Sequence, residues 1–138
     1  TLKMDQTLRG KIDTACRTAE DFIKVYYESI DKKRHQMTRL YMDNGVLVWN
    51  GNGATNKEAI QKYLIDLPAS EHNLLTLDAQ PILDDVVSSQ MTFLIQTSGT
   101  VKFQDNPSKP FQQTFMITAD GNKWKIASDC FRLQDALF

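Results

Sequence analysis

The sequence is short of residues that cross-link or break a chain: its 138 residues include two cysteines, six glycines and four prolines. Cys16 and Cys130 lack the Cys/His spacing of a zinc site, so we expect reduced, buried thiols of an intracellular protein and no metal. No apolar stretch approaches the roughly 18 residues that cross a membrane, and the N-terminus lacks the apolar core of a secretory signal. Without linkers or low-complexity tracts, residues 1–138 are predicted to form one domain, with 1–7 as a flexible extension.

Neither sign of charge is in excess, because 16 lysines and arginines stand against 17 aspartates and glutamates, for a net charge of −1. A nucleic-acid-binding domain of this size usually carries a basic excess, so direct binding of nucleic acid is not expected. The local positive patch at 32–35, with Arg39, is interpreted as a solvated helix end.

Residues that support catalysis are also scarce. His35 and His72 have no nucleophile near them in sequence, and both are predicted to be exposed to solvent. Asp84 and Asp85 form an acidic pair at a turn, for which solvation is favoured over metal binding. Asp129 lies in an apolar strand, where burial would raise its pKa, and a structural, hydrogen-bonded carboxyl is favoured over an acid or base. The chain is therefore expected not to be an enzyme.

The spacing of apolar residues predicts an amphipathic helix over 8–30, then a polar break and a short helix or turn that ends near residue 42. Asn50-Gly51 predicts a hairpin after a strand at 46–49. Thr55 and Glu58 have the spacing of a capping box and open a second helix, which Pro68 ends. Further strands are predicted at 74–82, 91–103, 111–119 and 123–133. This order favours an α+β domain, with helices on one face of a curved antiparallel sheet.

Alternation along 91–103 and 111–119 separates two faces of the predicted sheet. One face is largely apolar and must meet the helices: Met91, Phe93, Ile95, Thr97, Gly99, Val101, Phe103, Phe111, Gln113, Phe115, Ile117 and Ala119. The other face consists of Thr, Gln, Ser, Leu and Met with a single Lys, and such depletion of charge is typical of a protein interface. A Thr-rich solvated face is the alternative. In 123–133 neither alternate set is clearly apolar, so we expect a β-bulge that switches the faces.

Four segments together resemble the nuclear transport factor 2-like fold and, more closely, the NXT family, the small subunits of the metazoan mRNA export receptor. They are YYESIDKKRHQMTRLYMDNGVLVWNGNG at 26–53, GTVKF at 99–103, FQQTF at 111–115 and WKIASDCFRLQD at 124–135. The combination of LYMDN, WNGNGA and SDCFR is the specific signal. The resemblance implies a cone-like fold with three helices packed on a strongly bent antiparallel sheet.

The resemblance also implies a function. Such a chain is a non-catalytic subunit that pairs through its sheet face with the nuclear transport factor 2-like domain of a larger NXF-type receptor. The heterodimer carries messenger ribonucleoprotein through nuclear pores by contacting Phe-Gly repeats, which places it in the nucleus, the cytoplasm and the nuclear envelope. Arg132 of the SDCFR motif is implied to pair with an aspartate of the partner. The interface is predicted to comprise Arg132, Cys130, Ser128, Gln96, Leu94, Thr114, Met116 and Gln112. No cofactor is expected.

Two alternatives share this fold. An isomerase- or dehydratase-like enzyme would need a cavity that contains Asp129 and a second polar group, and a cone filled by aromatic side chains argues against it: Phe93, Phe115 and Phe131. A homodimer that imports the GTPase Ran would carry two acidic residues in the turn between the long strands. Gln104 and Asn106 stand at those positions, which disfavours Ran binding.

Overall fold

The computed structural model of the chain describes residues 6–82 and 91–134, so the predictions for Asp84, Asp85 and residues 1–5 lie outside the described part. Three helices and six strands follow one another along it. In chain order they are α1 (Gln6–Lys32), the 3-10 helix η1 (Arg34–Leu40), β1 (Tyr41–Trp49), β2 (Asn52–Thr55), α2 (Lys57–Ile65), β3 (Ser70–Ile82), β4 (Thr92–Phe103), β5 (Lys109–Asp120) and β6 (Lys123–Leu133).

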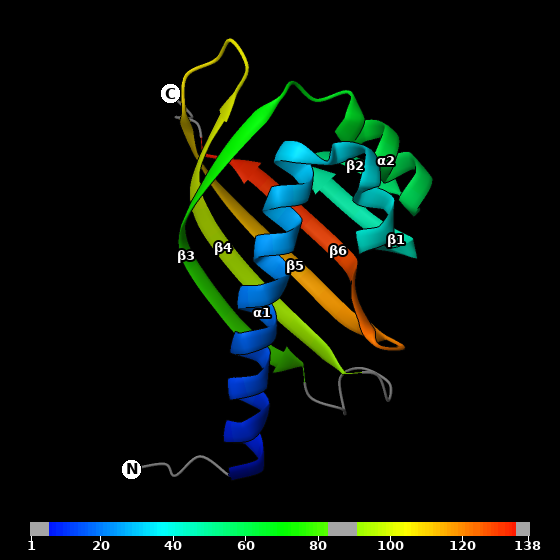
Figure 1. The fold of residues 1–138 in the computed structure, drawn as a ribbon, viewed down its shortest axis with the longest axis vertical. Helices are drawn as coiled ribbons and strands as arrows, with labels where there is room; N and C mark the ends of the chain where they lie inside the picture. Colours follow the sequence, from blue (N-terminus) through cyan, green and yellow to red (C-terminus); the bar gives the residue numbers. More distant parts are fainter. Residues whose placement is uncertain (1–5, 83–90, 135–138) are drawn as a thin grey trace.

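The six strands form one sheet in the order β2-β1-β6-β5-β4-β3, which curves around α1 (Figure 1). The predicted α+β class, with three helices on a bent sheet, is confirmed. The sheet is mixed rather than wholly antiparallel, because β1 and β6 pair in parallel. Parallel neighbours need a long crossover connection, and here the chain from β2 to β5 supplies it. The last strand is therefore central in the sheet.

Helix α1 buries a stripe of apolar and aromatic residues against the concave face of the sheet. The stripe follows the 3.6-residue period from which the helix was predicted. Its buried members are Ala15, Ala19, Phe22, Ile23, Tyr26, Tyr27 and Ile30. Neither α1 nor any other helix within residues 6–82 and 91–134 is long and apolar enough to cross a membrane.

The β1–β2 hairpin has the predicted Asn50-Gly51 turn, with φ of 48° and 84° at the two residues. The predicted capping box is wrong by one residue. Thr55 is the last residue of β2, and Asn56 caps α2 by accepting a hydrogen bond from the Ala59 N–H at 2.9 Å. A residue that pairs in a strand cannot also turn the chain into a helix, which is why the cap moves to Asn56.

The predicted alternation of β4 and β5 is confirmed for the central residues of both strands. The side chains that meet the helices are Phe93, Ile95, Thr97, Val101, Phe111, Gln113, Phe115 and Ile117. Met91 is an exception, since it precedes β4 and is 51% exposed. The predicted bulge in β6 is present at Ala127: Ile126 pairs with Ile117 and Ser128 with Met116. This extra residue turns Asp129 inward and leaves Ser128 on the outer face.

Gly99 of β4 lies against the backbone of β3. A Cβ atom built at this position would lie 2.0 Å from the Asn73 carbonyl oxygen. The register of β3 against β4 shifts between Leu74 and Thr76, so Leu75 forms a bulge beside this contact. Bulges bend and twist a strand, and the glycine allows the partner backbone to follow that bend.

Candidate partner interface

The eight predicted interface residues lie together on the outer face of the sheet. Hydrogen-bonded pairing aligns residues of β4, β5 and β6 into three adjacent cross-strand rows. The rows are Leu94–Met116–Ser128, Gln96–Thr114–Cys130 and Ser98–Gln112–Arg132. Directly paired residues share one face of a sheet, so these side chains form one continuous surface. Their role in binding a partner stays a prediction.

The first of these rows is the most apolar part of the surface. Leu94 and Met116 are half-buried, and the row continues across Ser128 to Val46 of β1, which is 39% exposed. The next row carries Cys130, which is exposed. The prediction of buried thiols is therefore wrong for Cys130 and also for Cys16, because both residues are exposed.

The backbone around Arg132 is held by the β1–β2 turn. The Asn50 N–H donates to the Phe131 carbonyl at 2.9 Å, and the Leu133 N–H donates to Asn50 Oδ1 at 2.7 Å. Asn50 therefore bridges the residues on both sides of Arg132. This contact gives a physical reason for the WNGNG and SDCFR motifs to occur together, because the first fixes the strand that presents the arginine.

Charge is sparse on this surface. With their β3 partners, the three rows contain twelve residues, of which Asp78 on β3 and Arg132 on β6 are charged. The sequence analysis missed Asp78 and Val46. The alternation of side chains within β3 and β1 was the available signal for these two residues. Their place on the outer face, however, depends on the register of β3 against β4 and of β1 against β6.

Asp129 lies directly beneath this face, with its side chain in the core. Its Oδ2 accepts hydrogen bonds from Tyr41 at 2.6 Å and Tyr26 at 3.2 Å, and its Oδ1 accepts one from Gln113 Nε2 at 2.8 Å. Burial raises the pKa of Asp129 to about 6, although the three hydrogen bonds oppose this shift. The prediction of a buried, hydrogen-bonded carboxyl with a raised pKa is confirmed.

Aromatic side chains fill the cone around this carboxyl. Phe93, Phe115 and Phe131 are each at most 1% exposed, as is Asp129. Tyr27 extends the polar network by donating to Gln113 Oε1 at 2.8 Å. Both oxygens of Asp129 accept hydrogen bonds from protein donors, and the residue is buried away from solvent.

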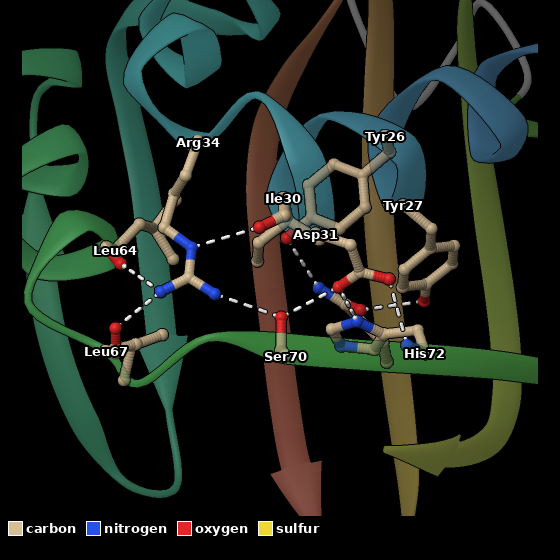
Figure 2. Close-up of polar contacts among 10 residues, drawn as sticks. Tyr26, Tyr27, Ile30, Asp31, Arg34, Leu64, Leu67, Ser70 and His72 are labelled. Carbon is tan, nitrogen blue, oxygen red and sulfur yellow. Dashed lines mark hydrogen bonds and ion pairs between the residues drawn. The ribbon is translucent and has the colours of Figure 1, made fainter. Parts of the chain in front are cut away.

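His72 does not lie in an exposed loop, as was predicted, but on β3 with its side chain 1% exposed (Figure 2). Its Nδ1 lies 2.7 Å from Asp31 Oδ1, and its backbone N–H donates to Asp31 Oδ2 at 2.9 Å. Ser70 Oγ donates to Asp31 Oδ1 at 2.7 Å. Partial burial works to raise the pKa of Asp31, but the hydrogen bonds and charge of His72 and the Ser70 bond hold it below its ordinary value.

Arg34 is half-buried rather than part of a solvated helix end (Figure 2). Its guanidinium donates to the carbonyl oxygens of Leu67 at 2.5 Å and Leu64 at 3.3 Å. It also donates to the Ile30 carbonyl and to Ser70 Oγ, both at 3.0 Å. One side chain therefore joins the ends of α1 and α2 to the start of β3, on the side of the sheet away from the candidate interface.

Comparisons with known proteins agree with this architecture. The family model "Nuclear transport factor 2 (NTF2) domain" matches residues 18–133. A curated protein, NTF2-related export protein 2 of Bos taurus, is 48% identical over 128 residues, which is 90% of this chain and 90% of that protein.

Two solved structures are similar in fold. The first is nuclear transport factor 2 of Cryptosporidium parvum, with a TM-score of 0.75 and 18% identity over 97% of this chain and 100% of that one. The second belongs to the Mtr2–Mex67 M domain complex of C. albicans, with a TM-score of 0.70 and 16% identity over 89% and 98%. At these identities the likeness shows the fold alone.

Proposed function

Since the chain belongs to the nuclear transport factor 2 (NTF2) domain family, we propose that it is the small, non-catalytic subunit of an mRNA export receptor. In this role it pairs, through the outer face of its sheet, with the NTF2-like domain of an NXF-type receptor. The heterodimer moves ribonucleoprotein between nucleus and cytoplasm and contacts Phe-Gly nucleoporins at the pore. The names of the curated relatives, NTF2-related export proteins, support the export role.

The observation that carries the proposal is the outer face itself. Three cross-strand rows place amide, hydroxyl and thiol groups around the partly exposed Leu94 and Met116, with Arg132 at one end. Interface centres are depleted of charge and enriched in Met and Arg, and this composition fits them. A solved complex of the same fold, Mtr2 with the Mex67 M domain, supports pairing with a second chain.

Catalysis is the weaker proposal, although the fold itself hosts enzymes. A buried acid with a pKa of about 6 is a feature that an acid or base catalyst needs. Here Tyr26, Tyr41 and Gln113 already bind both oxygens of Asp129, and phenylalanines occupy the space around it. Asp129 is therefore better explained as a group that holds β6 to the core.

Ran binding is disfavoured at the β4–β5 turn. Gln104 and Asn106 are exposed there, and an Asn106 side-chain N–H donates to the Gln104 carbonyl at 3.1 Å. Neutral amides at these positions do not supply the paired carboxylates that the Ran-importing homodimer uses. We therefore propose a heterodimer with an NXF-type receptor rather than a Ran-importing homodimer.

Co-expression tests the proposal. The chain and the NTF2-like domain of an NXF-type receptor should elute together with the mass of a 1:1 complex, measured by light scattering after gel filtration. Arg132→Asp should weaken the complex by about 2–5 kcal/mol, because it removes a cation and leaves the partner's aspartate facing a like charge. Arg17→Asp makes the same change of charge on the exposed side of α1 and should leave the complex intact. A wild-type chain that forms no complex would contradict the proposal, and full binding by Arg132→Asp would contradict the role of the arginine.

A further inference from the structure

We propose that Asp78 is a second charged anchor of the outer face, which receives a lysine or arginine of the partner and, with Arg132, sets the orientation of docking. This inference rests on the proposed function, because it concerns the same face. It adds a residue on a strand that the predicted interface did not include, and it states the chemistry of the partner group.

Asp78 has the right position for this role. It is exposed on β3 and pairs directly with Gln96 of β4. Its row continues through Thr114 to Cys130, in the middle of the predicted interface. Because direct cross-strand partners project to the same face, the carboxylate of Asp78 borders the surface that Gln96 and Thr114 form.

The surface is hollowed beside this carboxylate. Asp78, Ala79, Gln80, Leu94 and Gln96 line a depression of about 60 Å³ between β3 and β4. This volume accepts the end of one side chain. Leu94 offers apolar contact, while two glutamine side chains and the carboxylate offer hydrogen-bond acceptors. Lysine and arginine have an aliphatic stem that ends in a cation, so either side chain could make both the apolar contact and the hydrogen bonds.

The two charged residues of the three rows and their β3 partners, Asp78 and Arg132, have opposite charges and are well separated. Asp78 and Arg132 lie on β3 and β6, three strands apart, which is about 14 Å at the usual spacing of strands. Among the described residues, neither forms an ion pair. A partner that binds well therefore presents an acid over β6 and a base over β3, and a partner turned around would meet like charges.

One other role would explain Asp78. Strand β3 is at the edge of the sheet, and charged side chains on edge strands prevent other chains from pairing there. A lysine serves that purpose as well as an aspartate does. Reversal of the charge therefore separates the two explanations, because it keeps the protection of the edge and removes the attraction to a basic partner group.

The experiment measures the Kd for the NTF2-like domain of an NXF-type receptor by calorimetry, for wild type, Asp78→Lys, Asp78→Asn and Arg132→Asp. Asp78→Lys should weaken binding roughly tenfold or more, and Asp78→Asn should weaken it by a smaller factor. The loss in Asp78→Asn should shrink at high salt, where charge is screened. Glu20→Lys makes the same reversal of charge on the exposed side of α1, and this variant should bind like wild type.

The outcomes separate this inference from the proposed function. Wild-type affinity in Asp78→Lys, together with weak binding in Arg132→Asp, overturns the role of Asp78 and leaves the heterodimer in place. A wild-type chain that does not bind the receptor domain overturns both. Restored binding of Asp78→Lys to a receptor domain in which one interface lysine or arginine is changed to glutamate supports the inference and identifies the partner residue.

Discussion

Asp129 and Cys130 are neighbours in the chain but lie on opposite faces of β6, one in the core and the other at the centre of the candidate interface. The carboxyl is bound by two tyrosines and a glutamine, whereas the thiol is exposed. Strand β6 therefore has one face fixed by a polar network and another free to meet a partner. This arrangement makes separate predictions for stability and for binding.

The stability of the fold should depend on pH through Asp129. Its folded pKa of about 6 exceeds its ordinary value of 3.8, so the folded state favours the protonated form. The contribution of Asp129 to the free energy of unfolding is complete below about pH 4 and is lost as the pH rises through about 6. The free energy of unfolding should fall by about 3 kcal/mol over this range. Urea unfolding of wild type and Asp129→Asn between pH 4 and pH 7 measures it. The gain in stability on acidification should be smaller in the variant.

The contribution of Asp31 to stability changes with pH in the opposite direction. Its folded pKa is lowered, so this contribution is lost as the pH falls. Asp31 is present in both proteins, so the difference between their pH profiles isolates Asp129. Asp13→Asn, an exposed change on α1, should follow the wild-type profile. Identical profiles for wild type and Asp129→Asn would contradict the assignment of this pKa.

The two free thiols provide a footprint of the interface. Cys16 on α1 and Cys130 on the outer face are both exposed, so both should react with a maleimide in the isolated chain. In the complex with the receptor domain, Cys130 should be protected while Cys16 remains reactive. Peptide mapping by mass spectrometry measures both in one sample. If Cys130 were labelled equally fast in the complex, the partner would have to bind elsewhere.

Gly99 should not tolerate a methyl group. In Gly99→Ala the new Cβ would lie 2.0 Å from the Asn73 carbonyl oxygen, so the β3 backbone must move. We expect a loss of about 1–3 kcal/mol, the usual effect of an overpacked site, measured by denaturant unfolding. Gly10→Ala is the matched control, because nothing lies within 4 Å of that Cβ and alanine favours the helix. Equal stabilities for the two variants would show that the β3–β4 contact is not tight.

Arg34 should be irreplaceable by lysine. Its guanidinium reaches three backbone carbonyls and Ser70 from one planar group, and an ammonium cannot match that geometry. Arg34→Lys should lose about 1–3 kcal/mol of stability, since it leaves partly buried acceptors without donors. Lys33→Ala, an exposed neighbour, should stay within about 0.5 kcal/mol of wild type. A small effect of Arg34→Lys would mean that water replaces the lost bonds.

The two faces of β4 and β5 were predictable from sequence because large apolar side chains alternate with small polar ones over both strands. The bulge in β6 could also be inferred, since neither of the two alternating sets of side chains in 123–133 was apolar throughout. The contribution of β3 could not, because Asp78 joins the outer face only through its pairing with Gln96, past a shift in register. Parallel pairing of β1 with β6 depends likewise on contacts between residues far apart in the chain.

His72 and Arg34 show a second limit of the sequence. Polar residues near the end of a helix or beside a turn are usually solvated, and composition favours that interpretation. Their burial depends on Asp31 and on the carbonyls at the end of α2, groups that come together only in the folded chain. No pattern within either segment indicates those partners. The burial of Asp129, in contrast, could be predicted, because the strand that contains it is apolar.

The central place of β6 also matters during synthesis. A chain still emerging from the ribosome without residues 123–133 lacks the strand that lies between the β1–β2 hairpin and the β3–β4–β5 part of the sheet. Each piece then has an open edge, which is a site for aggregation. The strand that closes this gap is the same one that carries Ser128, Cys130 and Arg132. Under the proposed function, a nascent chain can therefore bind its partner only after this strand has joined the sheet.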